Sequence, residues 1–256
     1  MIDLHTHILP GVDDGPTTID ESVAIAAAAV ADGIEVVAAT PHVRDDYPTS
    51  PSRMEALVTE VREALATAAV PLDVRTGGEI ALERLPLLGD DDLRRFGLAG
   101  NARYLLLEFP YYGWPLELGT QIFALRTRGF TPVLGHPERN AEVQAAPEGL
   151  RRFVEQGALV QVTASSVDGR LGPQSRAAAF DLIERGLVHL LATDAHAPEL
   201  RATGLSAAAR KIGDESLAAW LTESVPAAII AGVPLPNRPE HGGGRRRFLR
   251  ARLRRS

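Results

Sequence analysis

Histidines and carboxylates recur in this chain close to the points where short apolar, partly β-branched runs end. The first run leads into His5 and His7, with Asp13 and Asp14 shortly beyond it. Later runs end near further residues of the same two kinds, namely His42, Glu79, Glu108, His136, Asp194 and His196. Imidazoles and carboxylates without thiolates are ligands that suit Zn, Mn or Fe, and mixed sets hold clusters of two or three ions. The residue types and their placement therefore predict a multinuclear metal centre.

The number of candidate ligands sets the size of this centre. His5 and His7 are two residues apart on a predicted strand, so both side chains point to the same face and can share one ion. Nine ligands are too many for one ion and suit three, if Glu79 bridges two of them. The nine are His5, His7, Asp14, His42, Glu79, Glu108, His136, Asp194 and His196. Asp13 is an alternative to Asp14, and the residues alone do not choose between them.

Two arginines near the candidate ligands indicate an anionic substrate. Arg139 follows His136 by three residues and Arg201 follows His196 by five. Both are expected in loops at the same face, where a guanidinium can bind phosphate through two parallel hydrogen bonds. Metal ions lower the pKa of bound water to roughly 7, so a hydroxide held between ions would be available near neutral pH. The predicted reaction is in-line attack of this hydroxide on phosphorus, without a covalent enzyme intermediate.

A barrel of alternating strands and helices would bring these distant residues together. Apolar runs alternate with Ala-rich helical stretches, the pattern of βα units around a parallel sheet. The predicted strands cover residues 2–7, 35–40, 72–76, 104–109, 131–135, 159–163 and 188–193. The predicted helices cover about 18–31, 51–68, 117–129, 148–156, 174–185 and 203–212, the first with Thr17 or Thr18 and Glu21 as a capping box. In a closed parallel α/β barrel the carboxyl ends of all strands converge on one face, and only strand 159–163 has no predicted ligand there.

Composition restricts the class of protein further. The chain has 256 residues, 45% of them hydrophobic, and no cysteine, which excludes disulfide, thiolate-metal and thiol-nucleophile chemistry. Residues 1–237 are predicted to form one domain with a net charge of −13, which argues against nucleic-acid binding. Residues 238–256 form a Gly/Arg-rich tail with a net charge of +7, predicted to be disordered, with contact to an anionic membrane surface or to nucleic acid as the alternative. No targeting or membrane-spanning pattern is found, and we expect a cytoplasmic location.

Six motifs occur in the order MIDLHTHILPGVDDG, ATPH, GGEI, LLLEFP, GHPERN and ATDAH. They resemble the PHP (polymerase and histidinol phosphatase) superfamily. Within it, residues 1–235 are similar to the manganese-dependent protein-tyrosine phosphatases of bacterial capsule and exopolysaccharide operons, the CpsB type. The resemblance implies a single-domain, distorted (β/α)7 TIM-like barrel with three divalent ions, Mn in the first place and Fe or Zn as alternatives. It also implies hydrolysis of phosphotyrosine on a membrane tyrosine autokinase.

The resemblance also assigns individual residues. It implies that His5, His7, Glu79 and Asp194 hold the first ion and that Glu79, Glu108 and His136 hold the second. Asp14, His42 and His196 would hold the third, and Arg139 and Arg201 would bind phosphate.

Two other functions stay open at this point. The same ligands would serve another phosphomonoesterase, acting on histidinol phosphate or a nucleotide, or a regulatory module that binds metal and a partner without catalysis. Tyr111, Tyr112 and Trp114 follow Glu108 and could flank a phosphotyrosine ring or pack as an ordinary loop. Glu138 could orient Arg139 or a histidine.

Overall fold

The computed structural model describes residues 1–197 and 204–240 and has a mixed α/β fold built on two parallel sheets. The first sheet has the order β1 (Ile2–Thr6), β2 (Val36–Ala39) and β4 (Asp73–Arg75). The second has the order β3 (His42–Val43), β5 (Glu79–Ala81), β6 (Tyr104–Glu108), β7 (Thr131–Gly135), β8 (Leu159–Thr163) and β9 (Leu190–Ala192). Within the described residues, all seven predicted strands are present, those at 131–135 and 159–163 with the predicted bounds.

Strands β3 and β5 were not predicted, and they continue β2 and β4 after a break in each. Pro41 lacks a backbone N–H, so it cannot extend the ladder from β2 into β3. A Cβ on Gly77 would lie 3.2 Å from the carbonyl oxygen of Ala39, and one on Gly78 would lie 2.6 Å from the Phe96 ring. The chain therefore needs glycine at the second break. Beyond both breaks pairing resumes in a new sheet, where His42 lies opposite Glu79.

The first and last strands lie side by side. The amide of Asp194 donates to the carbonyl of His5 at 2.9 Å, and the amide of His7 donates to the carbonyl of Ala195 at 2.9 Å. Asp3, fully buried, reinforces this seam because its Oδ1 accepts the amide of Thr193 at 3.0 Å. The carboxyl ends of β1 and β9 therefore open at the same place.

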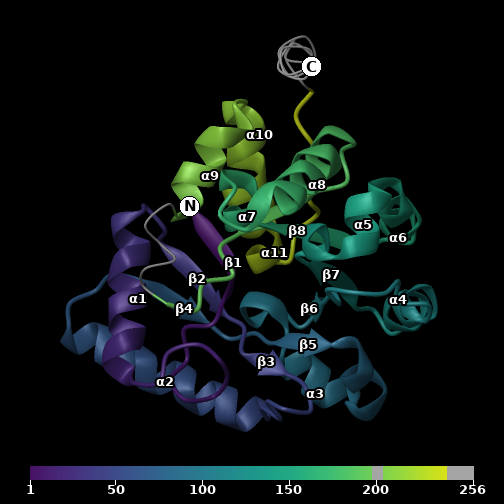
Figure 1. Ribbon diagram of the computed structural model, residues 1–256. Coiled ribbons are helices and arrows are strands. Elements are labelled where there is room, and N and C mark those ends of the chain that lie inside the picture. The colour runs from purple at the N-terminus through teal and green to yellow at the C-terminus, as the bar shows by residue number, and fades with distance from the viewer. Residues whose placement is uncertain (198–203, 241–256) are drawn as a thin grey trace.

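Helices surround the strands, with α1 (Ile19–Ala31) and α2 (Pro51–Thr67) on the side of β1, β2 and β4 (Figure 1). Thr18, not Thr17, caps α1: its hydroxyl accepts the amide of Glu21, and the Glu21 carboxylate accepts the amide of Thr18. The other predicted helices are α4 (Leu118–Thr127), α6 (Arg151–Glu155) preceded by the 3-10 turn η4 (Pro147–Leu150), α8 (Gly172–Glu184) and α9 (Gly204–Ile212).

Several short helical elements were not predicted. They are η1 (Leu82–Leu87), α3 (Asp90–Arg95), η2 (Leu98–Gly100), η3 (Pro137–Arg139), α5 (Ala141–Ala145), α7 (Ala164–Asp168), α10 (Glu215–Ala219), the π-helix η6 (Trp220–Ser224) and α11 (Val225–Ala231). No described helix is long and apolar enough to cross a membrane.

The last described residues fold back onto the body. The indole nitrogen of Trp220 donates to the carbonyl of Pro236 at 3.0 Å. Arg238 donates to the carbonyls of Ile183 and Val188 at 2.7 and 3.1 Å. The described chain is therefore anchored as far as Arg238, and the rest of the predicted tail from residue 241 lies outside the described residues.

Candidate metal centre

All nine predicted ligands lie in one cluster at the carboxyl ends of the strands. They form four overlapping groups, and within each group the ligand atoms lie no more than 4.8 Å apart. The groups are His7, Asp14, His42 and His196; His5, Glu79 and His136; His5, His7 and Asp194; and His42, Glu79 and Glu108. Residues from both ends of the chain meet here because β1 and β9 are neighbours.

Glu79 is the centre of this cluster and is fully buried. Its Oε1 lies 2.8 Å from His136 Nε2. Its Oε2 lies 3.4 Å from His5 Nε2, 3.3 Å from His7 Nε2 and 3.0 Å from His42 Nδ1. One carboxylate thus faces four imidazoles, which is the arrangement expected of a group that bridges two ions.

Neighbouring residues fix the ring orientation of the first two histidines. His5 Nδ1 lies 2.9 Å from Gln161 Oε1, so the amide oxygen accepts from this nitrogen. His7 Nδ1 lies 2.8 Å from Asp13 Oδ2 and donates to it in the same way. Both Nε2 atoms then face the cluster, 3.3 Å apart. A partner on the outer nitrogen is what holds ligating histidines in most metal sites.

The two neighbouring aspartates have different places. The Asp13 side chain is buried and belongs to none of the four groups; it accepts from His7, from the amide of His42 at 3.0 Å and from the amide of Gly15 at 3.0 Å. The Asp14 side chain is half exposed, and its Oδ1 lies 3.4 Å from His42 Nε2 and 3.3 Å from His196 Nε2. Asp14 therefore faces the cluster, and Asp13 supports it from outside.

Two members of the cluster have left-handed backbone conformations. His136 has φ 39°, and Asp194 has φ 52°. Non-glycine residues rarely adopt this region, and it costs about 1–3 kcal/mol each. His136 directly follows β7, and Asp194 lies two residues after the end of β9. Strain of this kind is concentrated at functional sites.

The close approach of these groups shifts their pKa values. Burial alone would lower the pKa of His5, but the charges of Glu79 and Asp194 outweigh it and raise this pKa to about 9. A hydrogen bond from His196 lowers the pKa of Asp14 to about 2. Burial and the charge of Glu79 raise the pKa of Glu108. The pKa shifts of His5 and Asp14 therefore favour their charged forms, whereas that of Glu108 favours its neutral form.

Arg139 lies against the cluster as predicted. Its Nη1 donates to Asp194 Oδ2 at 2.7 Å, and its guanidinium carbon lies 4.7 Å from the centre of the Tyr111 ring. The second predicted arginine, Arg201, lies outside the described residues.

Arg44, which was not predicted as a site residue, lies against another ligand of the cluster, Glu108. Its Nη1 donates to Glu108 Oε1 at 2.9 Å, and its guanidinium carbon lies 5.4 Å from the centre of the Tyr47 ring. The Tyr47 ring in turn stacks on His42 at 5.8 Å. The placement of Arg44 two residues after a predicted ligand is the signal that would have found it.

The strand without a predicted ligand supplies supporting groups. In β8, Gln161 orients His5, and its Oε1 also accepts the amide of His136 at 3.3 Å. Glu138 does not bind Arg139 in this structure; it accepts from the amide of Thr163 at 3.0 Å and from the hydroxyl of Ser166 at 2.7 Å. Glu138 thus ties the segment after β7 to the end of β8.

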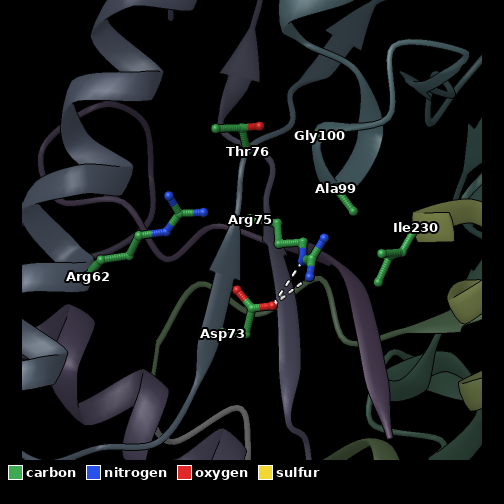
Figure 2. Close-up of a pocket in the computed structure, with 7 residues that line it drawn as sticks. All are labelled: Arg62, Asp73, Arg75, Thr76, Ala99, Gly100 and Ile230. Carbon is green, nitrogen blue, oxygen red and sulfur yellow. Dashed lines mark hydrogen bonds and ion pairs between the residues drawn. The ribbon is translucent and has the colours of Figure 1, made fainter.

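Two cavities lie away from the cluster. One of 320 Å³ lies beside β4, between α2 and α11 (Figure 2). In it Arg75 is paired with Asp73 at 2.9 Å, and Arg62 donates to the carbonyl of Val74 at 2.7 Å. This cavity shares no residue with the cluster and offers no comparable set of ligands.

The chemistry of the cluster fits divalent metal ions. Its donors are imidazole nitrogens and carboxylate oxygens, which suit Mn, Fe or Zn. Among the described residues, Glu79 Oε2 and His42 Nδ1 are buried without a hydrogen bond, although they lie 3.0 Å apart. Buried polar atoms without partners are costly, and a shared cation would satisfy both.

Comparison with known proteins gives consistent relatives. Residues 1–229 match the family described as capsular polysaccharide synthesis, CpsB/CapC. The chain is 36% identical over 199 residues to the tyrosine-protein phosphatase YwqE of Bacillus subtilis, covering 77% of each protein. It is 32% identical over 197 residues to a putative tyrosine-protein phosphatase, CapC, of Staphylococcus aureus, again covering 77% of each.

Solved structures agree with this result. One from a study of YwqE and of CpsB from Streptococcus pneumoniae, described there as unique metal-dependent tyrosine phosphatases, matches with a TM-score of 0.81 and 32% identity. The match covers 94% of this chain and 100% of that one. A probable 2-pyrone-4,6-dicarboxylic acid hydrolase from Acinetobacter baumannii, 14% identical with a TM-score of 0.52, shares the fold alone. The motif resemblance is confirmed, and the chain belongs to the CpsB/CapC family of capsular polysaccharide synthesis.

Proposed function

We propose that this protein is a metal-dependent protein-tyrosine phosphatase. The observation that carries the proposal is the convergence of nine imidazole and carboxylate ligands on one buried cluster with Arg139 beside it. The relatives that match over three quarters of their length are named tyrosine-protein phosphatases, and the similar solved structure is of a metal-dependent one.

The proposed centre holds three divalent ions, with Mn expected and Fe or Zn as alternatives. His5, His7 and Asp194 form one group, and Glu79 lies beside its two histidines. This arrangement supports the first predicted ion. His42, His196 and Asp14 form another, which supports the third. For the second ion, Glu79 pairs with His136 in one group and with Glu108 in another, so we propose that these three residues share it. When bound, such ions supply a hydroxide nucleophile near neutral pH and neutralise phosphate charge.

The protein's own residues would bind and orient the substrate. Arg139 now pairs with Asp194, and a bound phosphate offers its guanidinium two oxygens in place of one carboxylate oxygen. Arg201 is proposed as the second phosphate ligand. Gln161 and Asp13 keep His5 and His7 in one orientation during turnover, because each accepts a hydrogen bond from an outer imidazole nitrogen.

The remaining predictions belong to the same proposal. We infer a distorted (β/α)7 barrel, which the hydrogen bonds between the ends of β9 and β1 support. We also propose that residues 1–237 act as one domain and that the substrate is a tyrosine autokinase of the cytoplasmic membrane. The cytoplasmic location and the role of the basic tail stay predictions.

The test compares substrates and metal content together. Metal-free protein is loaded with Mn(II), its metal content is measured by mass spectrometry, and phosphate release is followed from a phosphotyrosine peptide and from histidinol phosphate. We expect close to three ions per chain and a preference for the peptide. His42→Ala should lower both metal content and activity.

His189→Ala is the matched control, because His189 is a part-buried histidine beside Trp220 and outside the four groups. Preference for histidinol phosphate would keep the metal centre and refute the proposed substrate. Loaded protein that releases no phosphate from either compound would indicate a regulatory module.

A further inference from the structure

Tyr111 lies against both the metal-ligand cluster, at His136, and the predicted phosphate-binding residue Arg139. Its ring is nearly parallel to the His136 ring, at 11° and with 5.8 Å between centres. The Arg139 guanidinium carbon lies 4.7 Å from the centre of the Tyr111 ring, close enough for a cation–π interaction. Tyr111 is nevertheless 39% exposed, so part of its ring is open to an incoming molecule.

The position of Tyr111 is fixed by the same segment that carries His136 and Arg139. Asn140 donates from its side-chain amide to the carbonyls of Pro110 and Gly113, at 2.8 and 3.0 Å. The amide of Ala141 donates to the carbonyl of Tyr111 at 3.1 Å. Three hydrogen bonds thus clamp the loop around Tyr111 to the residues that follow Arg139. A clamped aromatic ring loses little freedom when a ligand binds.

The two neighbouring aromatic residues do not share this arrangement. Tyr112 is 83% exposed. Trp114 packs on Phe153 with 5.7 Å between ring centres and lies edge-on to Phe109 at 6.2 Å. Of Tyr111, Tyr112 and Trp114, therefore, Tyr111 faces the cluster, Tyr112 faces solvent and Trp114 faces the core.

We propose that Tyr111 determines the preference of this site for aryl over alkyl phosphate esters. This inference rests on the proposed phosphatase function and adds the group that recognises the leaving alcohol. A phosphate held by Arg139 lies within reach of Tyr111 because the guanidinium and the ring are in contact. The ring of an aryl ester can then pack on the exposed part of Tyr111, whereas an alkyl ester offers no aromatic face.

Packing between two aromatic rings sets the size of the effect. Such pairs contribute about 0.5–1.5 kcal/mol beyond the area they bury, which corresponds to a factor of about 2–10 in binding. The described structure gives the Tyr111 hydroxyl no hydrogen bond, so the ring and not the hydroxyl is expected to matter. Tyr111→Phe should then behave as the wild type, and Tyr111→Leu should lose the preference.

The experiment measures inhibition of phosphotyrosine-peptide hydrolysis by phenylphosphonate and by methylphosphonate, which carry the same anionic group with and without a ring. In the Mn-loaded wild type, phenylphosphonate should bind more tightly. Tyr111→Leu should reduce the ratio of the two inhibition constants by about 2- to 10-fold, while Tyr111→Phe and the exposed control Tyr112→Leu leave it unchanged. Circular dichroism and metal content confirm that each variant is folded and loaded.

The outcomes separate this inference from the function beneath it. If Tyr111→Leu weakens both phosphonates equally, Tyr111 only positions Arg139 and the inference is wrong. If Tyr111→Leu changes neither constant, the inference is also wrong, although the wild type is an active phosphatase. A loaded wild type that does not hydrolyse the phosphotyrosine peptide refutes the proposed function itself, and the inference with it.

Discussion

Replacement of Asp13 by asparagine tests whether this residue supports a metal ligand without being one. In the structure, Asp13 Oδ2 accepts from His7 Nδ1 at 2.8 Å and from the amide of His42 at 3.0 Å, and Oδ1 accepts from the amide of Gly15 at 3.0 Å. Both oxygens therefore accept. Asparagine has one oxygen and one NH2 group, so in either orientation its NH2 group faces at least one N–H donor.

The size of the effect follows from these contacts. Loss of the partner of a ligating histidine typically lowers metal affinity by about 10–100-fold, or about 1.4–2.7 kcal/mol. Burial would raise the pKa of Asp13, but its hydrogen bonds with His7, Gly15 and His42 lower it, so the group is ionised in the folded protein. Because this charge is fully buried and has three donors, we expect the upper half of the range.

The assay is a titration of metal-free protein with Mn(II) against a fluorescent chelator. Asp13→Asn should keep the number of ions per chain and weaken the affinity. Asp14→Asn is the matched control, since Asp14 faces the cluster and its loss should lower the number of ions bound. An Asp13→Asn variant with wild-type affinity, or one that loses an ion while Asp14→Asn does not, would show that the two roles have been assigned wrongly.

Three further predictions follow from the titration of Glu108, His5 and His189. Burial and the charge of Glu79 already raise the pKa of Glu108, and Arg44→Ala removes the ion pair that counteracts them. The pH below which Mn loading fails should therefore move upward. Atomic absorption on protein equilibrated across pH 4–8 measures this pH. The charges of Glu79 and Asp194 outweigh burial and raise the pKa of His5 to about 9, so Mn uptake at pH 7 should release protons and should strengthen as the pH rises toward 9. Calorimetry in buffers of different ionisation enthalpy measures the released protons. Mn uptake without proton release would contradict this prediction. Burial and the charge of Arg238 lower the pKa of His189 from 6.5 to about 4. The contribution of neutral His189 to stability is therefore complete above pH 6.5 and is lost as the pH falls through 4, about 3 kcal/mol in all. Urea unfolding of the metal-free wild type and of His189→Gln at pH 7 and 4.5 should show a larger loss of unfolding free energy in the wild type.

The sequence was most informative where a strand is buried and uninterrupted. The runs 131–135 and 159–163 are wholly buried, and their apolar pattern predicted both bounds of β7 and β8. The short strands β3 and β5, beyond the breaks after β2 and β4, were missed because their pairing depends on tertiary contacts. Nothing in the order of residues shows that a Cβ on Gly78 would meet the Phe96 ring.

The helices after residue 212 were missed for a different reason. The last predicted helix covers 203–212, and no predicted strand follows it to mark a further βα unit. Glu215–Ala219 and Val225–Ala231 are short helices. Helices of this length are stabilised by tertiary packing of their apolar faces, so the sequence pattern alone did not indicate them.

Within the site, ligand types could be predicted, but the supporting residues could not. A histidine or glutamate at a strand end is a conspicuous signal. By contrast, Gln161 lies in the middle of a buried strand, and nothing in its type marks it as the partner of His5. Arg44 and Asp13 depend equally on how loops fold back, since their partners lie in other elements.

The contact between the ends of β1 and β9 has a consequence for the synthesis of the protein. In the group formed by His5, His7 and Asp194, His5 lies in β1, His7 directly follows β1, and Asp194 lies two residues after β9. At about 5–20 residues per second, a ribosome adds Asp194 roughly 10–40 s after His5. Throughout this interval the nascent chain carries only two of the three ligands of this group, so the proposed ion cannot bind there with its full set of ligands. A chain that stops before β9 therefore lacks this group however much metal the cell supplies.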